Sequence, residues 1–162
     1  MDALLLIDGY NLLHSAGVFV ESGPPTLERS RAALLDALLE RLPAKLAART
    51  IVAFDAEGAP PGLPREISHR GLAVRFARRG RSADELLEEL IAAAADPRNV
   101  TVVSSDHRVQ RAARQRGTAF IDSERWWHEL RQHSAAADPT DEKSAAPPGN
   151  PFPPGYARDL FR

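Results

Sequence analysis

The chain has 162 residues, of which 43% are hydrophobic and 6% are aromatic, and it contains no cysteine. This size and composition suit one domain with an ordinary hydrophobic core, and the lack of cysteine excludes disulfide scaffolds, cysteine-bound zinc and thiolate catalysis. The 21 Lys and Arg residues nearly balance the 22 Asp and Glu residues. A uniformly basic nucleic-acid binder is therefore excluded, whereas local basic patches are not.

The apolar run at residues 3–7 is the longest near the N-terminus. It is far shorter than the roughly 20 residues of a membrane helix. Asp2 is acidic where a signal peptide carries positive charge. We therefore expect a cytoplasmic protein that has no membrane partner.

Short aliphatic and β-branched runs predict five strands, at residues 4–7, 51–54, 72–76, 100–103 and 119–121. Helical patterns separate most of these strands, which favours right-handed crossovers and a mostly parallel sheet. The expected fold class is α/β, with helices on both faces of a central sheet in a three-layer α/β/α sandwich.

The ends of the helices are also readable. Thr26 is the expected N-cap of a helix with an apolar face that starts at Leu27 and ends near Pro43. The pair Ser82 and Glu85 forms an S-x-x-E capping box, which places Asp84 in the first turn of the next helix. Two further helices are predicted, one from Ser105 or Asp106 to Gly117 and one from Ser123.

The C-terminal stretch differs from the rest of the chain. Residues 134–162 hold six of the 13 prolines and show no apolar periodicity. We expect one domain at residues 1–133, followed by a Pro-rich, disordered tail. The short aromatic end of the tail is either a frayed terminus or a docking segment.

Aspartates follow the predicted strands, at Asp8, Asp55, Asp106 and Asp122. Ligand sites in parallel sheets lie at the carboxyl ends of the strands, so these side chains are expected to gather there with Asp84. Two carboxylates about 4 Å apart repel by about 4 kcal/mol at an effective dielectric of 20, and hard oxygens call for Mg²⁺ or Mn²⁺. The pattern predicts metal-assisted phosphodiester hydrolysis, with Asp8, Asp84 and Asp106 in the site. Asp55 fits either the site or a turn, and Asp122 is better explained as a cap.

Polar neighbours of these aspartates are candidate supporting residues. Asn11 lies one helical turn beyond Asp8, Gly9 permits a tight turn or a close approach, and Ser104 and Ser105 precede Asp106. Two histidines, His14 and His107, belong to no ligand pattern, and we expect neither to bind metal.

Two stretches are rich in arginine. The first holds one acid, Glu66, among six arginines: Arg65, Arg70, Arg75, Arg78, Arg79 and Arg81. The second has no acid and comprises Arg108, Arg111, Arg114 and Arg116. Basic flanks beside an acidic metal site suit a polyanionic substrate and therefore a nuclease, although the second stretch also fits a solvated helix face.

The segments LLLIDGYNLL, TIVAFDAEG, VRFARRGRSADELLEEL and VTVVSSDHRVQRAARQRGTAFID, in this order, resemble the YacP-like NYN domain of the PIN-like nuclease superfamily. The resemblance implies a PIN-like fold and a Mg²⁺- or Mn²⁺-dependent endoribonuclease of RNA processing or mRNA decay. It implies a substrate of single-stranded or structured RNA, and in some relatives the ribosome as a partner. Carried over by motif, the metal ligands are Asp8, Asp55, Asp84 and Asp106, with Asn11 as a catalytic support.

Within this interpretation, the expected RNA-binding residues are Arg78, Arg79, Arg81, Arg108 and Arg111. Other metal-dependent α/β enzymes fit less well, since Tyr10 replaces the second aspartate of the D-x-D in haloacid dehalogenases. No dinucleotide or P-loop motif follows any strand. The remaining alternative is a non-catalytic RNA- or ribosome-binding module with the same fold. The sequence predicts no particular oligomeric state.

Overall fold

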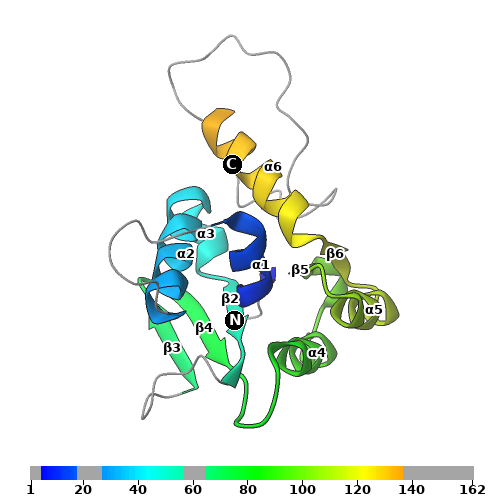
Figure 1. The fold of residues 1–162 in the computed structure, drawn as a ribbon. Coiled ribbons are helices and arrows are strands. Elements are labelled where there is room, and N and C mark those ends of the chain that lie inside the picture. The colour runs from blue at the N-terminus through cyan, green and yellow to red at the C-terminus, as the bar shows by residue number, and fades with distance from the viewer. Residues whose placement is uncertain (1–4, 18–26, 57–64, 137–162) are drawn as a thin grey trace.

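A single sheet of six strands organises the computed structural model, which describes residues 5–17, 27–56 and 65–136 (Figure 1). The spatial order is β3-β4-β2-β1-β5-β6, and all neighbours are parallel except β3 and β4. The strands are β1 (Leu5–Asp8), β2 (Thr50–Phe54), β3 (Glu66–His69), β4 (Leu72–Phe76), β5 (Thr101–Val103) and β6 (Ala119–Ile121).

Helices cover both faces of this sheet. One face carries α1 (Gly9–Ala16), α2 (Leu27–Arg41), α3 (Ala44–Ala47) and α6 (Ser123–Ala136). The other face carries α4 (Ala83–Ala93) and α5 (His107–Arg116), and a 3-10 turn, η2 (Pro97–Asn99), precedes β5. The expected three-layer α/β/α sandwich with a mostly parallel sheet is confirmed (Figure 1). In the described part of the chain, no helix has the length and hydrophobicity needed to cross a bilayer.

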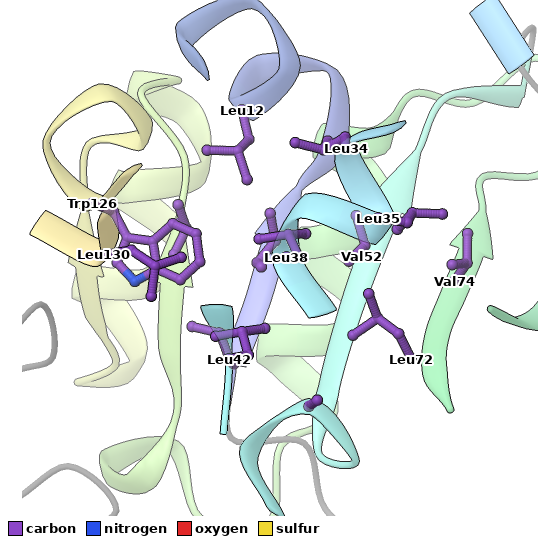
Figure 2. Close-up of a cluster of buried hydrophobic side chains, with 14 of the residues drawn as sticks. Leu12, Leu34, Leu35, Leu38, Leu42, Val52, Leu72, Val74, Trp126 and Leu130 are labelled. Atoms are coloured by element: carbon purple, nitrogen blue, oxygen red, sulfur yellow. The ribbon is translucent and has the colours of Figure 1, made fainter. Parts of the chain in front are cut away.

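Two hydrophobic clusters hold the layers together. In the larger cluster, Leu38 lies beside Val52 and Trp126 lies beside Leu130, and all four side chains are buried (Figure 2). The smaller one packs Leu87 and Val109, from α4 and α5, on the opposite face. Fully burying one large apolar side chain contributes roughly 1.5–3 kcal/mol, so each helix is fixed on its face mainly by a few such residues.

The antiparallel edge strand β3 was not predicted from the sequence. This strand forms a hairpin with β4 through Arg70 and Gly71, whose φ angles are 53° and 93°. Positive φ at both central residues is the geometry of the tight turns that join neighbouring antiparallel strands. The turn lies at the end of the sheet opposite the carboxyl ends of the parallel strands, where Arg70 pairs with Asp36 at 3.4 Å. Arg70 is therefore not beside the acidic edge, as the arginine-rich stretch had suggested.

Most predicted helix ends are confirmed. Ser82 Oγ accepts a hydrogen bond from Glu85 N at 3.3 Å, and Gly117 ends α5 in the left-handed conformation with φ 71°. Leu27 is 48% exposed, so it does not belong to the apolar face of α2. The last helix, α6, runs to Ala136, three residues into the expected tail. Thr26 and residues 137–162 lie outside the described residues.

The sheet has a topological switch point at its carboxyl edge, where α/β folds form a crevice. After β1 the chain enters α1 on one face, whereas after the neighbouring β5 it enters α5 on the other face. Connections that diverge in this way leave a gap above the ends of the two strands, which is where α/β folds bind ligands. Asp8 ends β1, and Ser104, Ser105 and Asp106 follow β5. The sequence segments IDGYN and SSD therefore meet at this edge.

Candidate active site

Asp8 is the central carboxylate of this crevice. It is only 5% exposed, and its Oδ2 accepts a hydrogen bond from Ser104 Oγ at 3.0 Å. The pKa of Asp8 is raised to about 7, mainly by burial and also by the negative charges of Asp84 and Asp55, while hydrogen bonds from Ser104 and the backbone of Asn11 act in the opposite direction. An uncompensated carboxylate is costly to bury, so this position favours a proton or a cation.

Ser104 links Asp8 to the third expected acid. Its hydroxyl donates to Asp8 and accepts from the backbone N–H of Asp106 at 3.1 Å. Asp106 Oδ1 in turn accepts from the N–H groups of Arg108 and Val109, at 2.8 and 3.4 Å, and so caps α5. A carboxylate has two oxygens, so a cap made by one of them leaves the other for a ligand.

Asn11 fixes the position of the loop that carries these residues. Its Oδ1 accepts from Ser105 N at 2.9 Å and from Ser123 Oγ at 2.6 Å. Ser105 Oγ also accepts from Ser123 N at 3.0 Å. One amide oxygen therefore joins α1, the loop after β5 and the start of α6. Asn11 lies within the predicted site, but these contacts make it a positioning residue.

Asp84 and Asp55 border the crevice from the other side. Asp55 follows β2, and its Oδ1 accepts from Ala83 N at 2.6 Å, which holds the first turn of α4 against the end of the strand. Asp84 is the next residue of that turn. Burial raises the pKa of Asp84, and the nearby charges of Asp106 and Asp55 raise it further.

The fold therefore gathers the four expected acids at one edge of the sheet, where they influence one another electrostatically. Within residues 5–17, 27–56 and 65–136, no group of three or more acidic or histidine side chains already has the spacing of a metal site. The donor set nevertheless fits a hard divalent cation, because it consists of carboxylate oxygens whose repulsion such an ion would relieve.

The arginines fall into different settings. Arg78, Arg79 and Arg81 lie in the connection from β4 to α4, next to Asp84, and all three are exposed. Arg108 makes a two-pronged ion pair with Glu88, at 2.5 and 3.1 Å, and its charge lowers the pKa of Asp84. Arg111 is exposed on α5, one turn further from the crevice.

The last two arginines of α5 do not flank the acids. Because α5 begins at the crevice, its last turn lies at the opposite edge of the sheet. There Arg114 stacks over the Phe120 ring at 5.3 Å, and Arg116 donates to Ala94 O at 3.3 Å. Of the second basic stretch, only Arg108 and Arg111 lie toward the site.

Two residues of the site's support were not among the candidates. Ser123 is fully buried and anchors Asn11, and Gln110 Nε2 donates to Ser104 O at 2.8 Å and to Asp122 Oδ1 at 2.7 Å. In the sequence, the Asp-Ser pair after β6 predicted a cap at Asp122 and a helix start at Ser123, but no contact with Asn11. Asp122 thus supports the loop after β5 through Gln110.

Comparisons with known proteins agree with this fold. A family model described as the YacP-like NYN domain matches residues 5–150. The crystal structure of Rae1 (YacP) from Bacillus subtilis is similar, with 26% identity and a TM-score of 0.58 over 81% of this chain and 74% of that one. The W164L mutant of that protein matches with 27% identity and a TM-score of 0.57 over 84% and 76% of the two chains. No curated protein matched the chain.

Proposed function

Since the chain belongs to the family of YacP-like NYN domains, whose function is nuclease-type and related to RNA, we propose that it is a divalent-metal-dependent endoribonuclease. The proposed reaction is hydrolysis of RNA phosphodiester bonds, in RNA processing or mRNA decay. One observation carries the proposal: a buried Asp8, with its pKa raised to about 7, lies among further carboxylates at the crevice between β1 and β5.

The proposed cofactor is Mg²⁺ or Mn²⁺. Asp8, Asp84 and Asp106 would hold it, with Asp55 as a fourth acid that also caps α4. When bound, such an ion would polarise the scissile phosphate and lower the pKa of a bound water. Carboxylate oxygens are the ligands that both ions prefer, and the mutual repulsion of these acids supports the assignment.

The remaining residues position the acids and the substrate. Ser104 holds Asp8 by one hydrogen bond and the start of α5 by another, while Asn11 fixes the loop between them. Gly9 lets α1 start directly behind Asp8. In this proposal Arg78, Arg79, Arg81 and Arg111 bind successive phosphates of single-stranded or structured RNA. Arg108, which is already paired with Glu88, borders Asp84 and adds positive charge there.

The family resemblance extends the proposal to RNA on the ribosome and to a cytoplasmic location. A second candidate function is a non-catalytic RNA- or ribosome-binding module. It is favoured by one observation: Asp55 and Asp106 both cap helices, so these two acids stabilise the fold without any metal.

Cleavage of end-labelled single-stranded RNA by the purified protein, in Mg²⁺, Mn²⁺ or a chelator, tests the proposal. Asp106→Asn is the informative variant because an asparagine oxygen can still cap α5 while the charge is removed. The matched control is Asp122→Asn, which keeps the acceptor for Gln110. We expect metal-dependent cleavage by the parent and the control, and none by Asp106→Asn, with RNA binding retained.

Two results would contradict the enzyme proposal. Equal cleavage by Asp106→Asn and the parent would place the activity outside these acids. Binding of RNA without cleavage in either metal, on naked RNA and on translating ribosomes, would favour the binding module.

A further inference from the structure

A hollow lies between the β3–β4 hairpin and α4. It is a cavity of about 270 Å³, and its walls carry four arginines: Arg65, Arg75, Arg78 and Arg81. Phe76 and Leu86 supply apolar surface. This volume is near the lower end of small-molecule pockets, roughly 300 Å³, so it suits one small unit rather than a duplex.

The charges around this cavity are only partly paired. Arg75 pairs with Glu66 at 3.4 Å, and Arg81 pairs with Glu85 at 3.3 Å. Arg65 and Arg78 are exposed and form no ion pair with any described residue. The exposed guanidinium groups of Arg65 and Arg78 are therefore available to a phosphate group.

A third glutamate adds negative charge to the arginine-rich wall of the cavity. Glu89 also lines the wall, is exposed, and forms no ion pair with a described residue. A carboxylate repels a bare phosphate, but it accepts hydrogen bonds from hydroxyl and amino groups. A ligand that carries an anion at one end and hydrogen-bond donors at the other matches this wall better than a free anion does. A nucleotide has this composition.

The cavity is tied to the acidic crevice by the chain itself. Residues 77–82, here called the arginine loop, connect β4 to α4. At one end of this loop, Ala77 N donates to Phe54 O at 2.9 Å, and just beyond the other end Ala83 N donates to Asp55 Oδ1 at 2.6 Å. Both anchors lie at the carboxyl end of β2. The same loop thus lines the cavity through Arg78 and Arg81 and is held to the acidic edge beside Asp55.

A tight turn in the arginine loop determines which of its arginines line the cavity. Arg81 N donates to Arg78 O at 2.7 Å, closing a tight turn in which Gly80 has φ 81°. Such a turn needs glycine at its third position. It brings Arg78 and Arg81 onto the wall of the cavity, whereas Arg79 does not line it.

We propose that this cavity is a nucleotide subsite, which holds one unit of single-stranded RNA next to the acids. Arg65 and Arg78 contact its phosphate, and Glu89 accepts from a ribose hydroxyl or a base amino group. The inference rests on the proposed function, since it assigns a binding position to the RNA of that same site. It also implies that the RNA path crosses the arginine loop toward the β3–β4 hairpin.

Binding of a fluorescent 12-residue oligouridylate tests the subsite without catalysis, because it is measured in chelator by anisotropy at several salt concentrations. The variant is Arg65→Ala/Arg78→Ala; both side chains are exposed, so the fold is retained. The matched control, Arg98→Ala/Arg116→Ala, removes the same charge at the opposite edge of the sheet. Thermal unfolding of each variant checks the fold.

We expect the subsite variant to bind at least about tenfold more weakly, with its salt slope reduced by about 0.7 for each lost phosphate contact. The control should stay within about twofold of the parent, since it lies outside the path. Equal losses in both variants, or no loss in the subsite variant, would overturn the inference.

The outcomes separate the subsite from the proposed function. Unchanged binding by the subsite variant together with metal-dependent cleavage by the parent would reject the subsite and leave the nuclease proposal intact. A parent that neither binds nor cleaves RNA would overturn both.

Discussion

The ring of Phe54 lies directly against the backbone of Gly9, so a methyl group at Gly9 would come within 2.6 Å of ring carbon Cδ1 and 2.7 Å of Cζ. Gly9 is the first residue of α1, and Phe54 is the last residue of β2. This contact lets α1 begin immediately after Asp8 while Asp55 follows the neighbouring strand. Asp8 and Asp55 therefore border the same crevice because Gly9, which follows Asp8 and packs against Phe54, has no side chain.

Replacing Gly9 with alanine should destabilise the protein by about 1–3 kcal/mol, the usual cost of overpacking a dense core. The direction of the change in unfolding free energy is informative, because replacing glycine with alanine inside a helix otherwise stabilises a protein by roughly 0.5–1 kcal/mol. Urea unfolding measures the difference in free energy.

The matched test of this explanation adds Phe54→Leu. The smaller side chain should remove the clash, so Gly9→Ala should cost less in the Phe54→Leu background than in the parent. A constant cost in both backgrounds would show that Phe54 is not the residue that excludes a side chain at Gly9.

Removing the Asn11 side chain should lower both stability and RNA cleavage. Asn11→Ala leaves Ser105 N and the buried Ser123 hydroxyl without their acceptor, at a cost of about 1–3 kcal/mol. Because the loop they hold carries Asp106, cleavage should fall as well. Denaturant unfolding of Asn11→Ala, Ser123→Ala and the double variant gives the coupling, which should be non-zero; strictly additive effects would contradict the shared hydrogen bond.

In chelator, the free energy of unfolding should fall as the pH rises from about 4 to about 7. Asp8 has a pKa of about 7 in the folded protein against an ordinary value of 3.8, so in this window the folded state holds a proton that the unfolded chain has lost. One such proton changes stability by up to about 1.4 kcal/mol per pH unit. The stabilisation of the folded state by the proton on Asp8 is complete below about pH 4 and is lost as the pH rises through about 7.

The check is the same titration of Asp8→Asn, which holds no titratable proton at that position. Its stability should depend less steeply on pH than that of the parent between 4 and 7. Parallel curves for the two proteins would show that Asp8 does not titrate in this range.

Mn²⁺ should raise the unfolding temperature, and more at pH 8 than at pH 6, because protons compete with the cation for Asp8. A ligand at 100 times its Kd stabilises the folded state by about 2.7 kcal/mol. Thermal unfolding with and without Mn²⁺ measures the shift. Asp84→Asn should reduce it, while Asp122→Asn should not; equal shifts in these two variants would argue against cation binding by Asp84.

Short-range patterns in the sequence determined much of this protein. The apolar runs predicted five of the six strands, and the cap at Ser82 and the end at Gly117 were found where they were expected. These features depend on a few neighbouring residues, so they can be read without the fold. The gathering of Asp8, Asp84 and Asp106 was also predictable, because strand ends in a parallel sheet share one edge.

Only the tertiary structure decided which hydrogen bonds and ion pairs these residues form. The bond from Ser104 to Asp8 joins positions 96 residues apart, and that from Ser123 to Asn11 joins positions 112 apart. The same holds for the arginines: Arg70 lies at the far end of a hairpin, and Arg108 pairs with Glu88 on another helix. Such partners depend on strand order and on the face each helix covers. Those are set by the packing of the whole core rather than by any local pattern.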